Sequence, residues 1–228
     1  MGRIWCISDT HIRHSELVIP DNIDIVIHSG DMGTYKDPYT NEKGVRDSLE
    51  WLNSLQIKYK VVIAGNHDTS IERKLIKPKE LYPDLIYLEH DFAMVEGLCI
   101  FGSPFTPSFG QGWAYNKARH KIGELWNDIP EYTDILVTHG PPLGILDHTE
   151  CGAGSEERAV ISCGDLSLLK RIKKLPSLKL HVFGHIHPEE RCPNSGIMQL
   201  NGFETKFVNA AVVDLDYKIN NNGIIIEI

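Results

Sequence analysis

The sequence lacks long hydrophobic runs and a secretory signal. None of its apolar runs approaches the ~20 residues that a membrane-spanning helix needs. The first apolar stretch does not form a signal peptide, because Asp9 and His11 interrupt it. We therefore expect a cytoplasmic protein with no membrane segment.

Cysteine is scarce and lacks the spacing of a metal or redox motif. The five cysteines are an odd number, and none of them forms a C-x-x-C pair. This usage favours free thiols in a reducing compartment over disulfides. Cys151 and Cys163 flank one loop, so a bridge between these two stays open.

Positive charge is also in short supply. The net charge is −8, whereas nucleic-acid-binding proteins usually present a basic face to the phosphates. One basic cluster, at 170–174, falls near the end of a predicted helix, where cations complement the helix dipole. The charge makes nucleic acid an unfavourable partner and favours a small substrate.

The chain has the length and the pattern of a single α/β domain. At 228 residues, one domain spanning 1–228 is expected. Apolar, β-branched runs alternate with helical patterns, which predicts an α/β sandwich. The predicted strands are Arg3–Ser8, Asp24–Ser29, Lys60–Ala64, Leu98–Gly102, Asp134–Thr138 and Lys179–Gly184.

Two helices and a different C-terminal pattern complete the prediction. Apolar residues at helical spacing over 45–55 predict a helix capped by Asn41, and those over 168–175 predict one capped by Asp165. After Pro188, strands joined by Asn/Gly turns predict a mainly antiparallel region. Two long loops, Ser103–His120 and Pro141–Gly164, follow predicted strands.

Short polar clusters follow several of the predicted strands. They are Asp9-Thr10-His11, Gly30-Asp31, Gly65-Asn66-His67-Asp68, Thr138-His139-Gly140 and Gly184-His185-Ile186-His187. Taken singly, each is typical of a turn or a helix cap. Strand ends in open α/β sheets, however, gather ligand sites. His, Asp and Asn converging there, without cysteine, indicate a two-metal hydrolase site.

The order of these clusters resembles the calcineurin-like metallophosphoesterase superfamily, over residues 4 to 211. The strings Ile135–Gly144, His181–Pro188 and Phe207–Ala211 are similar to a narrower branch, the metallophosphoesterase-domain-containing proteins. That branch includes relatives of the brain-expressed cyclic-nucleotide phosphodiesterases. The resemblance implies a four-layer α/β/β/α sandwich with two mixed β-sheets.

The resemblance also implies the roles of the site residues. Two divalent metals are expected, with Mn the first choice and Fe or Zn as alternatives. The implied ligands are Asp9, His11 and His187 for one metal, Asn66, His139 and His185 for the other, and Asp31 as the bridge. His67 is implied as the catalytic residue, with Asp68 orienting its ring.

The predicted activity is hydrolysis of small phosphate diesters by a metal-bridging hydroxide. The branch suggests cyclic nucleotides as substrates. His67 is expected to stabilise or protonate the leaving oxygen. In the loop 103–120, Trp113 and Tyr115 are candidates for stacking on a base, and Arg119 for contacting phosphate.

Other functions stay open at this point. A phosphomonoesterase or protein phosphatase, or a nuclease, would use the same metals. A scaffold that retains the fold without catalysis is a further alternative, although His67 and all the implied ligands are present. The loop between Leu143 and Gly164 departs from the narrower branch, which leaves substrate preference open. The natural substrate and the oligomeric state are not encoded in any pattern.

Overall fold

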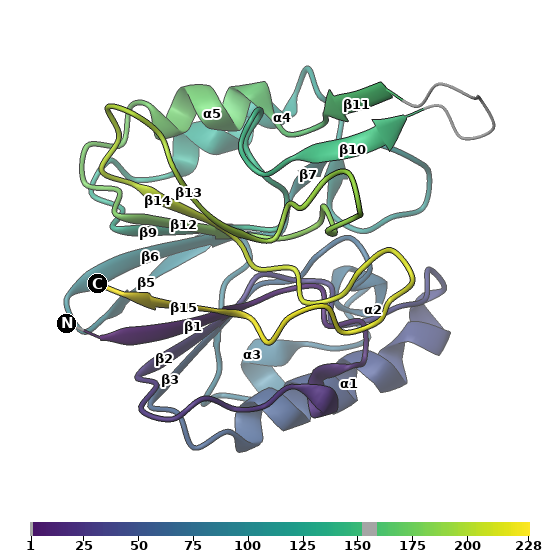
Figure 1. The fold of residues 1–228 in the computed structure, drawn as a ribbon. Helices are drawn as coiled ribbons and strands as arrows, with labels where there is room; N and C mark the ends of the chain where they lie inside the picture. The colour runs from purple at the N-terminus through teal and green to yellow at the C-terminus, as the bar shows by residue number, and fades with distance from the viewer. Residues whose placement is uncertain (1, 152–158) are drawn as a thin grey trace.

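Two β-sheets pack face to face, and helices cover the outer face of each sheet (Figure 1). The computed structural model describes residues 2–151 and 159–228. The resulting α/β fold has the predicted four layers, with two large mixed sheets in the middle.

The first sheet has a parallel core and one antiparallel edge strand at the C-terminal end of the chain. Its strands are, in spatial order, β15 (Ile224–Glu227), β1 (Arg3–Ile7), β2 (Ile25–His28), β3 (Tyr59–Val62) and β4 (Ile86–Tyr87). Because β15 pairs with β1, the two ends of the chain meet in one sheet, which supports our proposal of a single domain spanning 1–228.

The second sheet also has a parallel core, here with an antiparallel strand at each edge. Its strands are, in spatial order, β13 (Gly196–Gln199), β14 (Lys206–Asn209), β12 (Leu180–Phe183), β9 (Ile135–Thr138), β6 (Leu98–Ser103) and β5 (Asp91–Val95).

Helices and two small strand pairs complete the structure. On the side of the first sheet lie η1 (His14–Glu16), α1 (Pro38–Ser54), α2 (Thr69–Glu72) and α3 (Pro78–Leu81). On the side of the second sheet lie α4 (Ile122–Leu125), η2 (Trp126–Asp128) and α5 (Leu166–Ile172). Two small pairs are β7 (Thr106–Pro107) with β8 (Asn116–Lys117), and β10 (His148–Cys151) with β11 (Ala159–Ser162). None of the described helices is long and apolar enough to cross a membrane.

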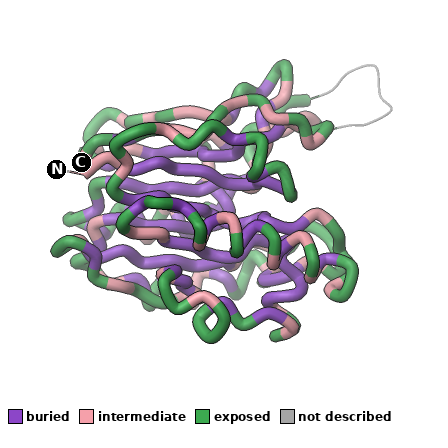
Figure 2. The backbone as a smooth tube through the Cα atoms, turned by 90° about the horizontal axis from the view of Figure 1, so that it is seen from below, coloured by how far each residue is buried: buried purple, intermediate pink, exposed green. Residues whose placement is uncertain are grey.

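Strand β1 shows why the predicted strands are apolar at every position. Ile4 and Cys6 point into the core between the two sheets, whereas Trp5 and Ile7 belong to the core beneath α1. Successive side chains of a strand face opposite sides, so a strand covered on both faces needs apolar residues at every position. Figure 2 shows the result, with buried backbone running through both sheets.

The six strand predictions before Pro188 are confirmed, and so is the Asp165 cap, whose side chain accepts a hydrogen bond from the Ser167 backbone N–H. The Asn41 cap was wrong. Asp37 caps α1 by accepting from the Thr40 backbone N–H at 2.9 Å, because the helix begins at Pro38, before the apolar pattern does.

The C-terminal region is mainly antiparallel, as predicted, since β13 pairs antiparallel with β14 and β15 pairs antiparallel with β1. The exception is β14, which also runs parallel to β12. The loop predicted at Pro141–Gly164 contains the antiparallel β10–β11 pair, of which β10 (His-Thr-Glu-Cys) is too polar to be recognised as a strand. All five cysteines are free thiols, so the bridge left open between Cys151 and Cys163 is not formed.

Candidate metal centre

The predicted ligands gather at one edge of the sandwich. Asp9, Asp31 and Asn66 follow the C-terminal ends of β1, β2 and β3 in the first sheet. His139 and His185 follow β9 and β12 in the second sheet. The parallel strands of each sheet end at the same edge, the one facing away from the N and C labels in Figure 1.

The backbone bends sharply where these side chains leave the strands. Asp9, His11, Asp31 and His185 all have positive φ, of 52°, 41°, 58° and 70°. This left-handed region is uncommon for residues other than glycine and is tolerated mainly where the surrounding structure enforces it. Here the bends turn four predicted ligands toward a common centre.

One group of ligand atoms comes from Asp9, His11 and His187, and these atoms lie within 4.8 Å of one another. His187 Nε2 is 3.3 Å from Asp9 Oδ1 and 3.3 Å from His11 Nε2. The three side chains can therefore hold one ion.

A second group lies beside the first. Atoms of Asp31, His139 and His185 again lie within 4.8 Å of one another. His139 Nε2 is 3.3 Å from Asp31 Oδ2 and 2.8 Å from Asn66 Oδ1. Asp31 Oδ2 is also 3.9 Å from His11 Nε2, which belongs to the first group. Asp31 thus stands between the two groups.

Backbone carbonyls fix the orientation of three histidine rings. In each ring Nδ1–H donates to a backbone carbonyl oxygen. His11 donates to Gly33 at 2.8 Å, His139 donates to Ser29 at 2.9 Å, and His187 donates to Asp214 at 3.0 Å. A carbonyl can only accept, so Nδ1 keeps its proton and Nε2 presents a lone pair to the centre. This arrangement is typical of metal-binding histidines.

The donor set fits cations. In a neutral His139 ring, Nε2 and Asn66 Oδ1 are both acceptors, yet they lie 2.8 Å apart. Burial alone would lower the pKa of His139, but the charge and hydrogen bond of Asp31 raise it to about 9. The proton on His139 Nε2 then lies between this nitrogen and Asn66 Oδ1, in the position that a metal ion bound by both would occupy.

The remaining charges of the centre follow from burial and proximity. Burial lowers the pKa of His11 to about 4 and that of His185 to about 3, so both rings are neutral, the form that binds metals. Burial alone would raise the pKa values of Asp9 and Asp31. The bond and charge of His187 instead lower that of Asp9, and the charge of His139 lowers that of Asp31.

His67 lies beside the ligand atoms. Its backbone N–H donates to Asp31 Oδ1 at 2.7 Å, and its Nδ1–H donates to the Thr34 carbonyl at 2.9 Å. Its Nε2 is 4.0 Å from Asp31 Oδ2. The nitrogen that can gain or lose a proton therefore faces the centre.

Asp68 does not contact the His67 ring, in contrast to the orienting role implied by the sequence. Its carboxylate accepts from backbone N–H groups at four positions: Asp31, Met32, Gly33 and Gly65, at 2.7 to 3.0 Å. Asp68 thus fixes the turn that carries Asp31, and Thr34 orients His67 instead.

Asn41 has a role that its sequence position did not reveal. It lies buried in α1, and its Nδ2 donates to the His67 carbonyl at 2.7 Å while its Oδ1 accepts from Ser70. Asn209, at the end of β14, donates to the carbonyl of Ile186 at 3.0 Å, between His185 and His187. Both asparagines position segments that carry site residues.

Gly184 lies where a side chain has no room. A Cβ at this position would collide with the side chains of Ser8 and Asp9. The backbone N–H of the next residue, His185, donates to Asp9 Oδ2 at 2.9 Å. The close approach of the two sheets at the centre therefore requires glycine here.

The ligand groups open into a metal pocket of about 200 Å³, lined by Asp31, Asn66, His67, His185 and His187 together with Phe109, Glu189, Leu215 and Tyr217. Trp113 packs on His67, with ring centroids 4.3 Å apart, and Lys36 Nζ lies 4.4 Å from the Trp113 centroid. Tyr217 and Glu189 carried no sequence signal that set them apart.

The other predicted substrate contacts lie elsewhere. Tyr115 is only 4% exposed, and its hydroxyl donates to Glu89, so the structure does not bring it to the metal pocket. Arg119 donates to the carbonyls of Cys163 and Gly164 and lines a neighbouring hollow of about 300 Å³.

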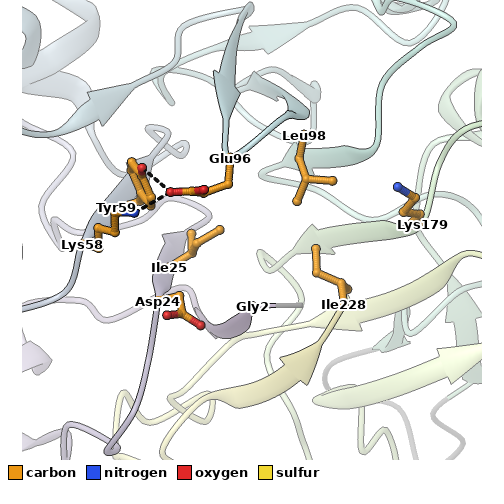
Figure 3. Close-up of a pocket in the computed structure, with 9 residues that line it drawn as sticks. All are labelled: Gly2, Asp24, Ile25, Lys58, Tyr59, Glu96, Leu98, Lys179 and Ile228. Carbon is orange, nitrogen blue, oxygen red and sulfur yellow. Dashed lines mark hydrogen bonds and ion pairs between the residues drawn. The ribbon is translucent and has the colours of Figure 1, made fainter.

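A larger hollow, of about 470 Å³, lies at the opposite ends of the strands (Figure 3). It is lined by residues at or before the starts of parallel strands, such as Gly2, Ile25 and Leu98. Its carboxylate Glu96 is bound by Lys58 and Tyr59, as the dashed lines in Figure 3 show. Its size does not make it the candidate active site, since the ligand groups are at the other edge.

Comparison with known proteins agrees with this geometry. Residues 2–189 match the family described as calcineurin-like phosphoesterase. Metallophosphoesterase domain-containing protein 1 of Homo sapiens is 34% identical, covering 99% of this chain and 71% of the relative. A UPF0046 protein of Caenorhabditis elegans is 33% identical, covering 99% of this chain and 80% of the relative. A solved archaeal phosphodiesterase covers 92% of this chain and 83% of its own, with a TM-score of 0.43 and 15% identity, too low a likeness to indicate activity.

Proposed function

Because the chain belongs to the calcineurin-like phosphoesterase family, we propose that it is a metal-dependent phosphodiesterase acting on small phosphate diesters. The observation that carries this proposal is the adjacency of three groups of potential ligands: Asp9, His11 and His187; His11, Asp31 and His67; and Asp31, His139 and His185. Such a centre suits the hydrolysis of phosphate esters.

Asp9, His11 and His187 would hold one ion, Asn66, His139 and His185 the second, and Asp31 both. Two divalent ions there supply positive charge for the phosphate and lower the pKa of a bound water. Imidazole, carboxylate and amide ligands without thiolate suit Mn, and also Fe or Zn. We choose Mn as the first ion to test.

His67 is proposed as the residue that transfers a proton to the leaving oxygen. The Thr34 carbonyl holds Nδ1–H, so Nε2 is the nitrogen available for this transfer. Asn41 and the Asp31 carboxylate hold the His67 backbone from opposite sides. These bonds fix the backbone of His67, and the Thr34 carbonyl fixes its ring.

A small, singly charged diester, such as a cyclic nucleotide, is the proposed substrate. The net charge of −8 opposes a long polyanion, and the metal pocket of about 200 Å³ is small. Trp113 packs on His67 and is a further candidate for contacting the substrate. We also place the protein in the cytoplasm, a proposal that rests on its free cysteines.

The test compares model substrates that share one leaving group. Metal-loaded protein should hydrolyse bis(4-nitrophenyl) phosphate with a higher kcat/KM than 4-nitrophenyl phosphate. A preference for the monoester would replace this proposal with a phosphomonoesterase. Cleavage of neither, by folded protein loaded with any of Mn²⁺, Fe²⁺ or Zn²⁺, would favour a scaffold.

A further inference from the structure

A second hollow opens directly beside the metal pocket. It has a volume of about 300 Å³ and shares Phe109, Thr149, His185 and Ile186 with the lining of the metal pocket. We refer to it as the side hollow. Because four lining residues are common to both, the two hollows adjoin, and a group attached to a phosphate at the metals is within reach of the side hollow.

The side hollow offers an aromatic face and apolar walls. The Phe109 ring is 50% exposed, although it packs against His185, with centroids 4.9 Å apart, and stacks near Trp113. Pro107, Pro141 and Ile186 add apolar surface. A half-exposed phenylalanine held in place beside a polar metal centre is suited to contact a flat, apolar group.

Arg119 provides the charge of the side hollow. Within its described lining it is the one residue among lysine, arginine, aspartate and glutamate. Its guanidinium is held by the carbonyls of Cys163 and Gly164, at 2.8 and 3.1 Å. A guanidinium has five N–H groups, so donors remain after these two bonds. Arg119 is absent from the lining of the metal pocket, which separates it from the phosphate position.

We propose that the side hollow binds an aromatic group of the substrate ester, with Phe109 against its face and Arg119 donating to an acceptor on its far edge. This inference rests on the proposed phosphoesterase function and adds a substrate class, the diesters of aryl or nucleobase-bearing alcohols. Phe109 and Arg119 are then the residues that determine the specificity of the enzyme for this substrate class.

Non-hydrolysable phosphonates test the aromatic site by binding alone. Calorimetry would give the Kd values of phenylphosphonate and methylphosphonate for the Mn²⁺-loaded protein. The two share a head group, so their ratio cancels any effect on the metals. We expect phenylphosphonate to bind about 10-fold more tightly, and Phe109→Ala to reduce this ratio to about 2-fold.

Phe92→Ala is the matched control for this ratio. Phe92 is 44% exposed and lies on the edge strand β5, outside the side hollow. This variant should keep the 10-fold ratio. A ratio near 1 in the unaltered protein, or an equal loss in both variants, would overturn the aromatic site.

The role of Arg119 is measured with 4-carboxyphenylphosphonate. It should bind more tightly than phenylphosphonate by about 10-fold, and Arg119→Met should remove this gain. Arg46→Met is the control and should retain it, since Arg46 is a half-buried residue of α1 that pairs with Glu42. No gain, or a gain that survives Arg119→Met, would overturn this contact.

The outcome for methylphosphonate separates the two proposals. If methylphosphonate binds only with metal and bis(4-nitrophenyl) phosphate is hydrolysed, but phenylphosphonate gains nothing, only the side hollow is wrong. If no phosphonate binds and no ester is cleaved, the proposed phosphoesterase function is wrong, and the inference about the side hollow, which rests on it, is wrong as well.

Discussion

The two ends of the sandwich differ in how their polar and charged side chains are paired. At the ends where the strands start, charged groups are paired: Glu96 with Lys58, Asp134 with Lys179, and Asp24 with the Arg3 backbone N–H. At the ends where the strands finish, acceptors face one another across the centre, as His139 Nε2 and Asn66 Oδ1 do. The end with the larger hollow therefore pairs its carboxylates with lysines or a backbone N–H, whereas the other end gathers His, Asp and Asn around one centre and is the one equipped for chemistry.

The largest difference between the two ends is expected when one carboxylate at each end is neutralised. Asp31→Asn should weaken metal binding by more than about 100-fold and abolish diester hydrolysis, since even groups behind the ligands contribute 10- to 100-fold. Glu96→Gln should leave both unchanged. Metal content by mass spectrometry and turnover would be compared, and equal effects at both ends would contradict the contrast.

A second change separates catalysis from metal binding within the active end. His67→Ala should lower kcat by about 10²- to 10⁴-fold while the metal content stays at two per chain. The reason is that only proton transfer to the leaving oxygen is lost. Loss of metal in this variant would make His67 a ligand instead.

A smaller effect is expected from substituting Asp68, which fixes the turn that carries Asp31. Asp68→Asn replaces one acceptor oxygen by an amide nitrogen, so backbone N–H groups around Asp31 lose a partner. Metal affinity should fall by about 10- to 100-fold. Asp134→Asn is the control, because Asp134 also accepts a backbone N–H, from Cys99, at the other end. Metal titrations of both variants would measure the difference, and equal affinity in the two would refute it.

The smallest expected effect concerns pH. Burial lowers the pKa of His181 to about 3, whereas the unfolded chain has about 6.5. Between these values the unfolded state binds more protons, so the free energy of unfolding should decrease as pH falls, by up to about 1.4 kcal/mol per pH unit for this ring. His181→Gln should reduce the slope by that amount in chemical denaturation of metal-free protein. An unchanged slope would mean that the ring titrates normally.

The sequence predicted the position of the site better than its internal contacts. Strand ends could be located because buried parallel strands are apolar throughout and the polar clusters follow them directly. The bonds from His11 and His139 to backbone carbonyls could not be predicted, because they join segments brought together only by the sheet order. The same holds for Asn41, whose partner His67 is 26 residues away.

Aromatic residues in the loop 103–120 were the least predictable. Trp113, Tyr115 and Phe109 have similar composition around them, yet Tyr115 is buried against Glu89 while Phe109 is half exposed beside His185. Which ring faces the core depends on the turn between β7 and β8, and local pattern carries no information about that choice. The fold class, by contrast, follows from alternation along the whole chain, so single errors did not alter it.

The most direct test of the central claim is metal add-back. Protein stripped of metal would be titrated with Mn²⁺ while bound metal and hydrolysis of bis(4-nitrophenyl) phosphate are measured together. We predict that activity rises with occupancy and reaches its maximum at about two ions per chain. Full activity without metal, or saturation at two ions with no hydrolysis, would contradict the assignment of this edge as a two-metal phosphodiesterase centre.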